Sequence, residues 1–455
     1  MFRNLRRWIS APAVIALSAS LMLTACNGDG TDGGDLAVAP RSTDGGGTLS
    51  PATLATFTQY TGSTAGRATG QPIRLGFVNT ENGPGSFPEY TIAVTDAVRL
   101  LNEQLGGVKG RPIELDLCHP DDAGQAEQCA QKFTADPTIA AVLHGAIDAS
   151  TAPFHRVLSP KLPVLGGLPL QPADAAAPNS YYFSSGQFGA LGVVTYAKTY
   201  AKADKVSLLT TEGFVASERA VAAIKQGLEA SGVKVTVAKY PANSTDLTEP
   251  LAASGAANAD LFIPVVADAA HCVNIQNALQ ELRINTQVLT LAGCLSQEVR
   301  TKLGDYPRWN YMTFNISAEA SASDDTTAWQ LRALKEWFPP LGARGVPSTA
   351  GVMMLQMTLV AARVLGSLPG DQLNPATVGA AFRKFNGPVF LGVPRLVFGG
   401  IPGLPAIGSL SSRVYNYLGN DDWRDTTAGS WLEPPPPTAA TPSSSGRPSA
   451  SASRR

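Results

Sequence analysis

The sequence lacks the motifs that mark common catalytic sites. It contains no G-x-S-x-G elbow, no H-E-x-x-H helix and no G-K-[ST] phosphate loop. Histidine is scarce, and its positions form no nucleophile–base pair at a recognisable spacing; they are His119, His144, His155 and His271. We therefore expect a protein that is not an enzyme and that has no cofactor.

The sequence also lacks an excess of either charge. It has 35 Lys and Arg against 36 Asp and Glu, and no basic run lies on a predicted face. Nucleic-acid-binding proteins carry clustered positive charge that meets the phosphate backbone. We therefore exclude nucleic acid as a partner.

Long apolar runs are missing except near the N-terminus. Basic residues Arg3, Arg6 and Arg7 precede an apolar stretch at 9–22, which is too short to span a bilayer comfortably. This stretch ends in "LTAC", which resembles the lipobox of bacterial lipoproteins, where the cysteine is diacylated and becomes the new N-terminus. Residues 1–26 are thus predicted to be a lipoprotein signal peptide, with Cys26 as the lipidation site; an ordinary cleavage site with a chance cysteine is the alternative. The mature protein would be lipid-anchored at the outer face of the cell membrane.

Two further segments have little apolar clustering. Residues 27–71 are rich in Gly, Thr, Ser, Ala and Asp, and residues 433–455 form a Pro/Ser tail. Such compositions bury too little apolar surface to fold. We predict a flexible tether and a disordered tail on either side of a globular part.

Cysteine is sparse but even in number once the lipobox is set aside; the four remaining residues are Cys118, Cys129, Cys272 and Cys294. An even number in an exported chain favours disulfides, and three pairings are possible. The shortest loops join the first to the second and the third to the fourth, and we predict these pairs. The adjoining His119 and His271 raise the alternative of a metal site, but neither cluster has the C-x-x-C spacing of zinc sites, so no metal is expected.

Short apolar runs alternate with helical patterns along the globular part. The segment 88–105 shows this well, because Pro88 suits a first helical position and an apolar stripe follows until Gly106 and Gly107. The predicted strands are residues 73–79, 112–117, 139–145, 163–167, 205–210, 233–240, 260–266 and 286–293. The pattern predicts an α/β fold with parallel sheets that are covered on both faces.

Parallel sheets of this kind bind ligands beyond the carboxyl ends of their strands. The segments that follow the predicted strands are mostly small or polar: "NTENGPGSF", "HGAIDAST", "GGLPLQ", "TTEGF", "VADAAHC" and "AGCLSQ". They come from both halves of the chain. This arrangement predicts a ligand cleft between two α/β lobes.

Several stretches resemble the type I periplasmic substrate-binding proteins of the branched-chain amino acid (Leu/Ile/Val-binding) family. The most specific is the helix that ends in "NEQLGGVKGRPIEL", followed by "CHPDDAGQAEQCAQKF", "ADLFIPVVADAAHC" and "GLPAIGSLSSRVYNYLGNDDW". The resemblance implies two Rossmann-like lobes joined by three crossovers, near Ser184, Ser296 and Val393. Lobe 1 would comprise residues 72–184 plus 297–392, and lobe 2 residues 185–296 plus 393–432.

Candidate ligand contacts from the first lobe lie at two predicted helix starts. Ser86 and, as second choice, Asn82 lie on the loop before a helix N-terminus, which suits a carboxylate, with a plain turn as the alternative. Ser150 and Thr151 start a later helix, where hydroxyls of the family hold the ligand carboxylate, although N-capping competes with this role. His144 ends a predicted strand beside the cleft and could donate to a ligand, but a structural role is more common for such a histidine.

From the second lobe the resemblance implies two contacts. Phe214 stands where the family often has an aromatic residue, with core packing as the competing role. Asp268 lies near the family's acidic residue that receives an α-ammonium group, with helix capping as the competing role. The loop "GGLPLQ" departs from the family, because Leu168 and Leu170 replace small polar residues there.

Together these observations predict an extracytoplasmic solute-binding lipoprotein. It would capture a small ligand, an amino acid or a similar small carboxylate, and deliver it to an ABC permease. The alternative is a ligand-sensing or adhesion-type lipoprotein of the same fold without a transporter, which the absence of a neighbouring permease gene would favour. An enzyme is a distant third, which turnover of a bound compound would revive.

Overall fold

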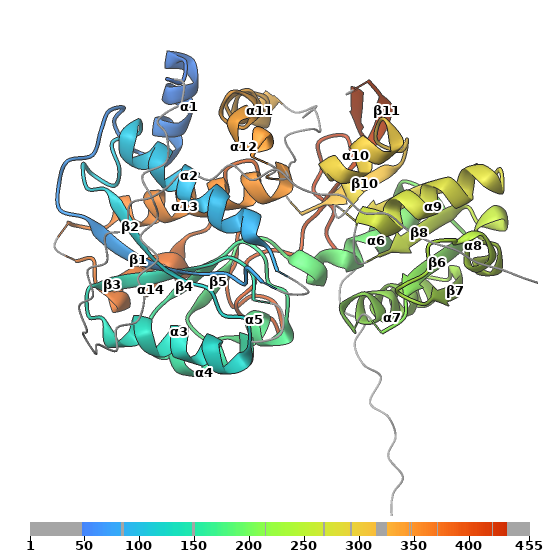
Figure 1. Ribbon diagram of the computed structural model, residues 1–455, viewed down its shortest axis with the longest axis horizontal. Coiled ribbons are helices and arrows are strands. Elements are labelled where there is room, and N and C mark those ends of the chain that lie inside the picture. Colours follow the sequence, from blue (N-terminus) through green and yellow to red (C-terminus); the bar gives the residue numbers. More distant parts are fainter. Residues whose placement is uncertain are drawn as a thin grey trace, which may run out of the picture. The chain divides into compact units, whose positions relative to one another are not determined.

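The computed structural model describes residues 48–434, apart from 83–85, 148–150, 214, 267–268, 292–293, 315–324, 345, 347, 371 and 421. The predicted signal peptide and almost all of the predicted tail therefore lie outside the described residues. Within them, strands and helices alternate and build two sheets (Figure 1). The predicted α/β class with parallel-dominated sheets is confirmed.

The first sheet has the strand order β2-β1-β3-β4-β5, and every recorded pair is parallel. The strands are β1 (Ile73–Val78), β2 (Ile113–Cys118), β3 (Ile139–His144), β4 (Val164–Gly166) and β5 (Ser180–Tyr182). The register aligns their last residues in one row, Val78, Cys118, His144, Gly166 and Tyr182. The loops that follow these residues thus start from one edge of the sheet.

Helices cover both faces of the first sheet. Figure 1 shows α2 (Pro88–Glu103) and α13 (Ser348–Ser367) on one side, and α3 (Ala123–Ala135) and α4 (Thr151–Leu158) on the other. The predicted apolar stripe of α2 is buried: Tyr90, Val94, Ala97, Val98 and Leu101, with Leu105 beyond the helix end. Gly106 and Gly107 both have positive φ, and a Cβ on Gly106 would lie 2.2 Å from the carbonyl oxygen of Thr64. Glycine therefore permits the turn after α2.

The second sheet has the strand order β12-β11-β10-β9-β8-β6-β7. Its strands are β6 (Lys205–Thr211), β7 (Lys234–Tyr240), β8 (Leu261–Val265), β9 (Gln287–Leu291), β10 (Asn310–Thr313), β11 (Arg413–Gly419) and β12 (Asp422–Asp425). The pairs from β7 to β10 are parallel, whereas β11 and β12 join as an antiparallel hairpin. The antiparallel edge is compatible with an otherwise parallel α/β sheet.

Successive residues of β6 point to opposite apolar clusters. Leu208 belongs to the cluster with α6 (Gly192–Thr199) and α7 (Val215–Ala230). Leu209 belongs to the cluster with α8 (Thr248–Ser254) and α9 (Ala269–Glu281). Both leucines are fully buried. A strand buried on both faces explains why its sequence is a continuous apolar run rather than an alternation.

The remaining helices include short connecting turns. They are α1 (Pro51–Thr61), α5 (Pro172–Ala176), η1 (Gly186–Leu191), η2 (Ala256–Asn258), α10 (Gln297–Leu303), α11 (Asp325–Trp337), α12 (Pro339–Ala343) and α14 (Pro375–Lys384). Helix α13 is apolar and long enough to cross a bilayer, but 83% of its window Ala350–Ser367 is buried inside the protein. It is a core helix.

The predicted tether is wrong in one part. Helix α1 lies within residues 27–71, and its Phe57 and Tyr60 are buried, with Tyr60 Oη donating to the carbonyl of Pro388 at 2.9 Å. The ring of Phe57 lies 5.4 Å from that of Phe390. Polar composition hid this helix, because two aromatic side chains on one face suffice to anchor it.

Two of the predicted crossover positions are also wrong. Strand β10 pairs with β9, so the chain is still in the second sheet at Thr313 rather than leaving it near Ser296. Gly408 donates to the carbonyl of Tyr182 at 3.0 Å, so the chain lies beside the first sheet well past Val393. Strand β10 is only four residues long, and Gly408 lies in no helix or strand. Neither segment therefore carries a sequence pattern that assigns it to its sheet. Near Ser184, where the first crossover is predicted, strand β5 of the first sheet ends at Tyr182, and the next strand, β6, belongs to the second sheet.

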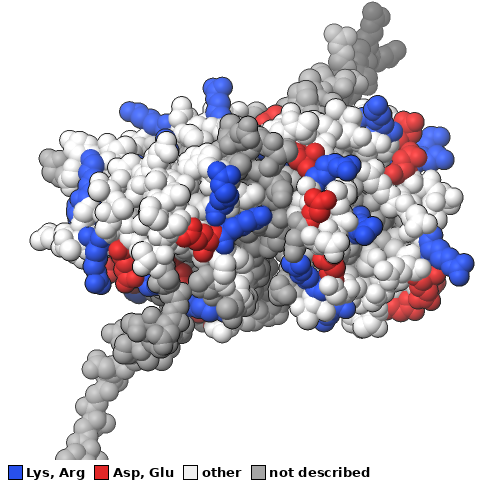
Figure 2. Space-filling view, turned by 90° about the horizontal axis from the view of Figure 1, so that it is seen from above, with Lys and Arg blue, Asp and Glu red and all other residues white. Residues whose placement is uncertain are grey.

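Charged side chains are scattered over the face of the molecule in Figure 2. Lysine and arginine alternate with aspartate and glutamate, without a large patch of one sign. The described part of this face therefore agrees with the balanced charge of the sequence.

Candidate functional site

The loops after β1 and β3 are joined by one buried side chain, Asn79. Its amide nitrogen donates to the carbonyl of Phe87 at 2.7 Å, and its amide oxygen accepts the backbone N–H of Ala146 at 3.1 Å. The backbone N–H of Thr80 also donates to the carbonyl of Ala146 at 2.9 Å. Asn79 thus fixes two neighbouring loops at the carboxyl edge of the first sheet.

Gly145 allows these two loops to approach. A Cβ at this position would lie 2.8 Å from Oδ1 of Asn79 and 2.9 Å from the ring of Phe77. Any other residue would push the Asn79 side chain away from its partners. The sequence prediction included Gly145 in a strand but did not identify the role of Asn79, whose only signal was an asparagine at the end of a predicted apolar strand.

The first predicted ligand loop is closed by a hydrogen bond from the N–H of Phe87 to the carbonyl of Thr80 at 2.8 Å. Ser86, next to Phe87, is half-buried. Asn82 is exposed, and its amide nitrogen donates to Oδ1 of Asp121 at 3.2 Å. Asn82 therefore contacts the β2–α3 loop, and both Asn82 and Ser86 stay predicted ligand contacts.

Thr151 is the first residue of α4 and is 2% exposed. Its partner in the prediction, Ser150, lies outside the described residues. Because Asn79 ties the loop after β3 to the loop after β1, the segments that carry Thr151 and Ser86 leave the sheet side by side. The structure therefore brings the two hydroxyl residues Ser86 and Thr151 to the carboxyl edge of the first sheet.

The predicted contacts from the second sheet, Phe214 and Asp268, also lie outside the described residues. They follow β6 and β8, which are paired neighbours with Thr210 opposite Val265. The hydroxyl of Thr210 donates to the carbonyl of Val265 at 3.0 Å. The two segments therefore start from adjacent positions at the carboxyl edge of the second sheet.

The leucine-rich loop after β4 is tightly packed. A Cβ on Gly167 would lie 2.5 Å from Cγ of Met353, and Leu168 and Leu170 pack against the apolar core. The backbone N–H groups of Leu170 and Gln171 each donate to Oδ2 of Asp174 at 2.9 Å. This loop thus contributes apolar packing and backbone rather than the small hydroxyls expected from the family resemblance.

His144 has a structural position rather than a ligand-facing one. It is fully buried, with its ring among those of Phe154, His155 and Tyr182. Burial lowers the pKa of His144 to about 4, against the opposing charge of Asp174. Burial alone would raise the pKa of Asp174, but the hydrogen bond from His155 and the nearby imidazoles hold it below its usual value. His144 is therefore neutral at neutral pH.

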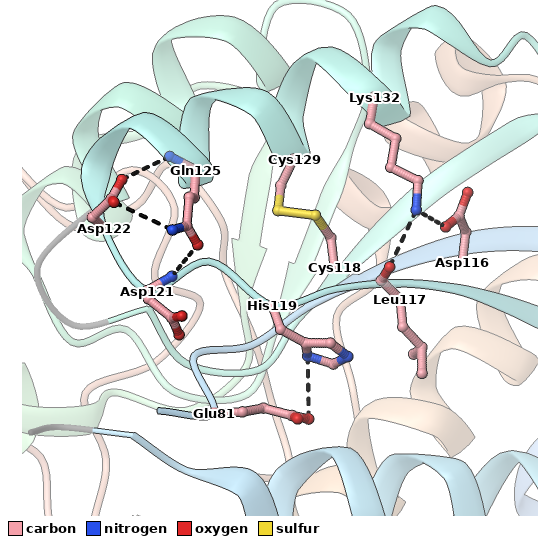
Figure 3. The surroundings of a disulfide bond; sticks show 10 residues. All are labelled: Glu81, Asp116, Leu117, Cys118, His119, Asp121, Asp122, Gln125, Cys129 and Lys132. Carbon is pink, nitrogen blue, oxygen red and sulfur yellow. Dashed lines mark hydrogen bonds and ion pairs between the residues drawn. A yellow bond between two sulfur atoms is a disulfide. The ribbon is translucent and has the colours of Figure 1, made fainter. Parts of the chain in front are cut away.

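Both predicted disulfide pairings are present in the structure. Cys118 at the end of β2 joins Cys129 in α3, and Cys272 in α9 joins Cys294 after β9. Figure 3 shows the first bond beside His119, whose Nδ1 lies 3.1 Å from Oε1 of Glu81. Since the sulfur atoms are bonded to each other, these clusters offer no free thiolate to a metal.

A groove of about 860 Å³ lies at a different place, near the first residues of β9 and β10. Its lining includes Arg283, Arg308 and Arg424. Parallel α/β sheets bind ligands at the carboxyl ends of their strands, and Gln287 and Asn310 in this groove mark the amino ends. We therefore place the candidate ligand site at the opposite edge.

Comparisons with known proteins agree with this geometry. A sequence profile described as "Periplasmic binding protein" matches residues 72–394, which is most of the chain. The chain belongs to this family of binding proteins, which serve ABC transporters. A search of curated proteins found no match.

Solved structures share the fold at low sequence identity. The leucine-binding protein LivK from Thermotoga maritima has a TM-score of 0.57 at 14% identity, covering 80% of this chain and 99% of its own. A fatty acid ABC transporter substrate-binding protein from Thermomonospora curvata has a TM-score of 0.59 at 15% identity, with coverages of 82% and 94%. A solute-binding protein from Rhodopseudomonas palustris in complex with 4-hydroxybenzoate has 0.58 at 14% identity, with coverages of 78% and 95%. Identities this low establish the fold and leave the ligand open.

Proposed function

We propose that the protein is a lipid-anchored extracytoplasmic solute-binding protein that captures an amino acid or a similar small carboxylate and delivers it to an ABC permease. The observation that carries the proposal is the family match over residues 72–394. The two sheets support it, because their carboxyl edges present small, polar loops from both halves of the chain. We expect closure of the two lobes over the ligand.

The carboxylate half of the ligand has support beyond the family. Leucine, fatty acids and 4-hydroxybenzoate, the compounds named for the three similar structures, all carry a carboxylate. In this chain Asn79 ties together the loop that carries Ser86 and the loop that leads to Thr151, the first residue of α4. Hydroxyls and backbone N–H groups at a helix N-terminus suit a carboxylate.

The proposal that the ligand also carries an α-ammonium group rests on Asp268 and on the sequence alone. If this carboxylate meets an α-ammonium group, removing it leaves a desolvated cation unpaired, which costs roughly 2–5 kcal/mol of binding. A ligand at 100 times its dissociation constant stabilises the folded protein by about 2.7 kcal/mol. A thermal-shift screen therefore has the sensitivity to separate the two halves.

The test uses three matched compounds for each amino acid: the amino acid, its amide and its deaminated acid. We expect amino acids to raise the melting temperature, and Asp268→Asn to abolish this response. Asp246→Asn is the control, because Asp246 is exposed and accepts hydrogen bonds from its own neighbour Thr248. Stabilisation by the deaminated acid alone, or normal binding by Asp268→Asn, would refute the zwitterion and leave a simple carboxylate.

The anchor has its own test at Cys26, which lies outside the described residues. We expect Cys26→Ala to yield a soluble protein or an unprocessed precursor, without a lipid-modified form. The readout is metabolic labelling with a radioactive fatty acid. Normal labelling of this variant would contradict lipidation at Cys26 while leaving solute binding untouched.

A further inference from the structure

A buried polar cluster lies at the carboxyl edge of the first sheet, and the ligand site proposed above does not use it. It consists of His144 at the end of β3, His155 in α4, Asp174 in α5 and Tyr182 at the end of β5. We call these four residues the histidine cluster. Their exposed fractions are 0%, 5%, 0% and 0%. Four polar side chains from four separate elements thus meet in the protein interior.

The donor atoms of the cluster lie close together. Nε2 of His155 is 2.9 Å from Oδ1 of Asp174, and Nε2 of His144 is 3.8 Å from the same oxygen. One atom each from His144, His155 and Asp174 lies within 4.8 Å of the others. Tyr182 Oη is 3.2 Å from Nε2 of His155 and donates to Oδ1 of Asp174 at 3.3 Å.

His144 is the member that the protein alone leaves unexplained. Neither of its ring nitrogens has a hydrogen-bond partner in standard geometry, although the side chain is fully buried. Buried polar groups without partners are rare in folded proteins, and each needs a reason such as a bound ion or water. The nearest charged atom to this ring is Oδ1 of Asp174, which also faces His155.

The other two side chains are held in fixed orientations. Oδ2 of Asp174 accepts the backbone N–H groups of Leu170 and Gln171, so Oδ1 is directed at the histidines. Nδ1 of His155 is 3.0 Å from Oγ of Ser159, which leaves Nε2 to face Asp174. Supporting hydrogen bonds of this kind orient the ligands of protein metal sites.

We propose that His144, His155 and Asp174 bind one divalent transition-metal ion, with Zn²⁺ as the best match. Two imidazole nitrogens and one carboxylate oxygen are a zinc donor set, and tetrahedral bonds of zinc length place donor atoms about 3.4 Å apart. The observed separations of 2.9 and 3.8 Å lie on either side of this value. Tyr182 Oη is placed to complete four ligands as a neutral phenol, so it releases no proton.

Binding of the ion moves a proton within His155. The proton that Nε2 holds against Asp174 in the metal-free state shifts to Nδ1, which donates to Oγ of Ser159, so that Nε2 is free to bind the ion and the imidazole stays neutral. The site is closed, as structural zinc sites are, so the ion enters while the chain folds. The absence of C-x-x-C spacing hid this site from the sequence, because its ligands come from separate elements.

The ion would connect the core to the candidate ligand loops. His155 lies one helical turn after Thr151, and His144 directly precedes the loop of Gly145. Fixing both imidazoles would therefore fix the start of α4 and the end of β3. This role concerns the first sheet itself and does not depend on the identity of the solute.

The experiment is a refolding test on the full chain without an affinity tag and with its disulfides intact. The protein is unfolded in urea with a chelator, refolded with or without Zn²⁺, desalted and analysed by elemental mass spectrometry. We expect one zinc ion per chain and a higher melting temperature after refolding with zinc. Co²⁺ in place of Zn²⁺ should give the visible absorption of a tetrahedral site, which Zn²⁺ suppresses when the chain is refolded with both ions.

Variants locate the ion. We expect His144→Gln and Asp174→Asn to lose stoichiometric zinc, and Ser159→Ala to weaken binding by about 10–100-fold, as for other supporting residues. His119→Gln is the control, because His119 pairs with Glu81 outside the cluster. Wild-type protein that refolds to its native spectrum without retaining zinc or cobalt overturns the proposal, as does equal retention by a folded His144→Gln. Should His144→Gln fail to fold, the cobalt spectrum of the wild type still shows whether the chain holds a tetrahedral metal site, and a wild type without this spectrum overturns the proposal.

Discussion

The two sheets each bury a charged group, but they satisfy it in different ways. In the second sheet, Arg413 at the start of β11 pairs with Asp425 at the end of β12, and both side chains are 0% exposed. In the first sheet, Asp174 of the histidine cluster faces imidazoles, and neither ring nitrogen of His144 has a hydrogen-bond partner in standard geometry. The two aspartate side chains are thus equally buried, but Asp425 faces a guanidinium and Asp174 faces imidazoles.

The carboxylate of Asp425 is held by several donors besides Arg413. Oδ1 accepts the N–H and hydroxyl of Thr427, and Oδ2 accepts the N–H of Gly429 at 2.7 Å. Burial would raise the pKa of Asp425, but the hydrogen bonds from Thr427 and Gly429 and the charge of Arg413 hold it below its usual value. The pair is charged throughout the physiological pH range.

The Arg413–Asp425 pair is therefore purely structural, whereas the histidine cluster can respond to pH and to metal ions. Arginine does not lose its charge in proteins, so the Arg413–Asp425 pair either stays intact or breaks. Imidazoles exchange protons or bind metal ions near neutral pH. The comparison therefore predicts that the second sheet responds to mutation and the first sheet responds to solution conditions as well.

The largest effect is expected from breaking the Arg413–Asp425 pair. Asp425→Ala leaves a buried guanidinium without its carboxylate, which should lower the free energy of unfolding by about 3–5 kcal/mol. Urea denaturation measures this change, with exposed Asp422→Ala on the same strand as the control. The double variant Arg413→Met/Asp425→Leu should recover most of the loss. A wild-type-like Asp425→Ala would show that the pair carries little of the stability.

The disulfides allow a second comparison between the sheets. In the chain-entropy view, closing loops of 11 and 22 residues contributes about 3 kcal/mol each, with the longer loop about 0.6 kcal/mol ahead. We expect both double variants, Cys118→Ala/Cys129→Ala and Cys272→Ala/Cys294→Ala, to lower the free energy of unfolding. The loss should be larger for the second, which opens the longer loop. Non-reducing peptide mapping checks the bonds first, and free thiols or crossed pairs would contradict the structure.

Acid should destabilise the first sheet through His144. Its pKa is about 4 in the folded protein against 6.5 for an ordinary histidine, so the unfolded chain binds more protons between these values. In metal-free protein, stability should therefore fall as the pH drops from 6.5 towards 4, by roughly 3 kcal/mol at most. Unfolding of wild type and His144→Gln across this range measures the difference. Parallel curves for the two proteins would argue against the assignment.

The smallest expected effect concerns the ligand hydroxyls. Thr151→Val removes a buried hydroxyl with little change of shape, which should weaken binding of the ligand found in the thermal-shift screen by about 1–3 kcal/mol. Asn82→Ala is the matched comparison, because the Asn82 amide is already paired with Asp121. Isothermal titration of both variants tests this ranking. Equal losses would place Asn82 in the site beside Thr151, and no loss for Thr151→Val would remove Thr151 from it.

Much of the fold could be predicted because each element carries its own signal. Helix α2 has Pro88 at its start and a buried stripe of period 3.6, and the doubly covered strands are apolar runs. Helix α1 could not be predicted from composition, since its burial depends on Phe390 far along the chain. Strand β10 is four residues long and is defined by its partners β9 and β11.

The candidate site was less predictable than the fold. A loop residue such as Asn79 shows its role only through the atoms that it joins, and the hydrogen bond from Asn82 to Asp121 could not be seen in the sequence. The histidine cluster brings together residues from β3, α4, α5 and β5, and no local spacing indicates that meeting. Tertiary contacts, rather than periodicity, define both features.

The central claim is that the protein holds a small solute and releases it unchanged. Equilibrium dialysis of the purified chain against isotopically labelled amino acids and small carboxylates, followed by mass spectrometry of the recovered compound, tests this most directly. The account predicts saturable binding of one molecule per chain and recovery of the same compound after unfolding the protein. Recovery of a chemically altered compound, or no binding of any compound that carries a carboxylate, would contradict it.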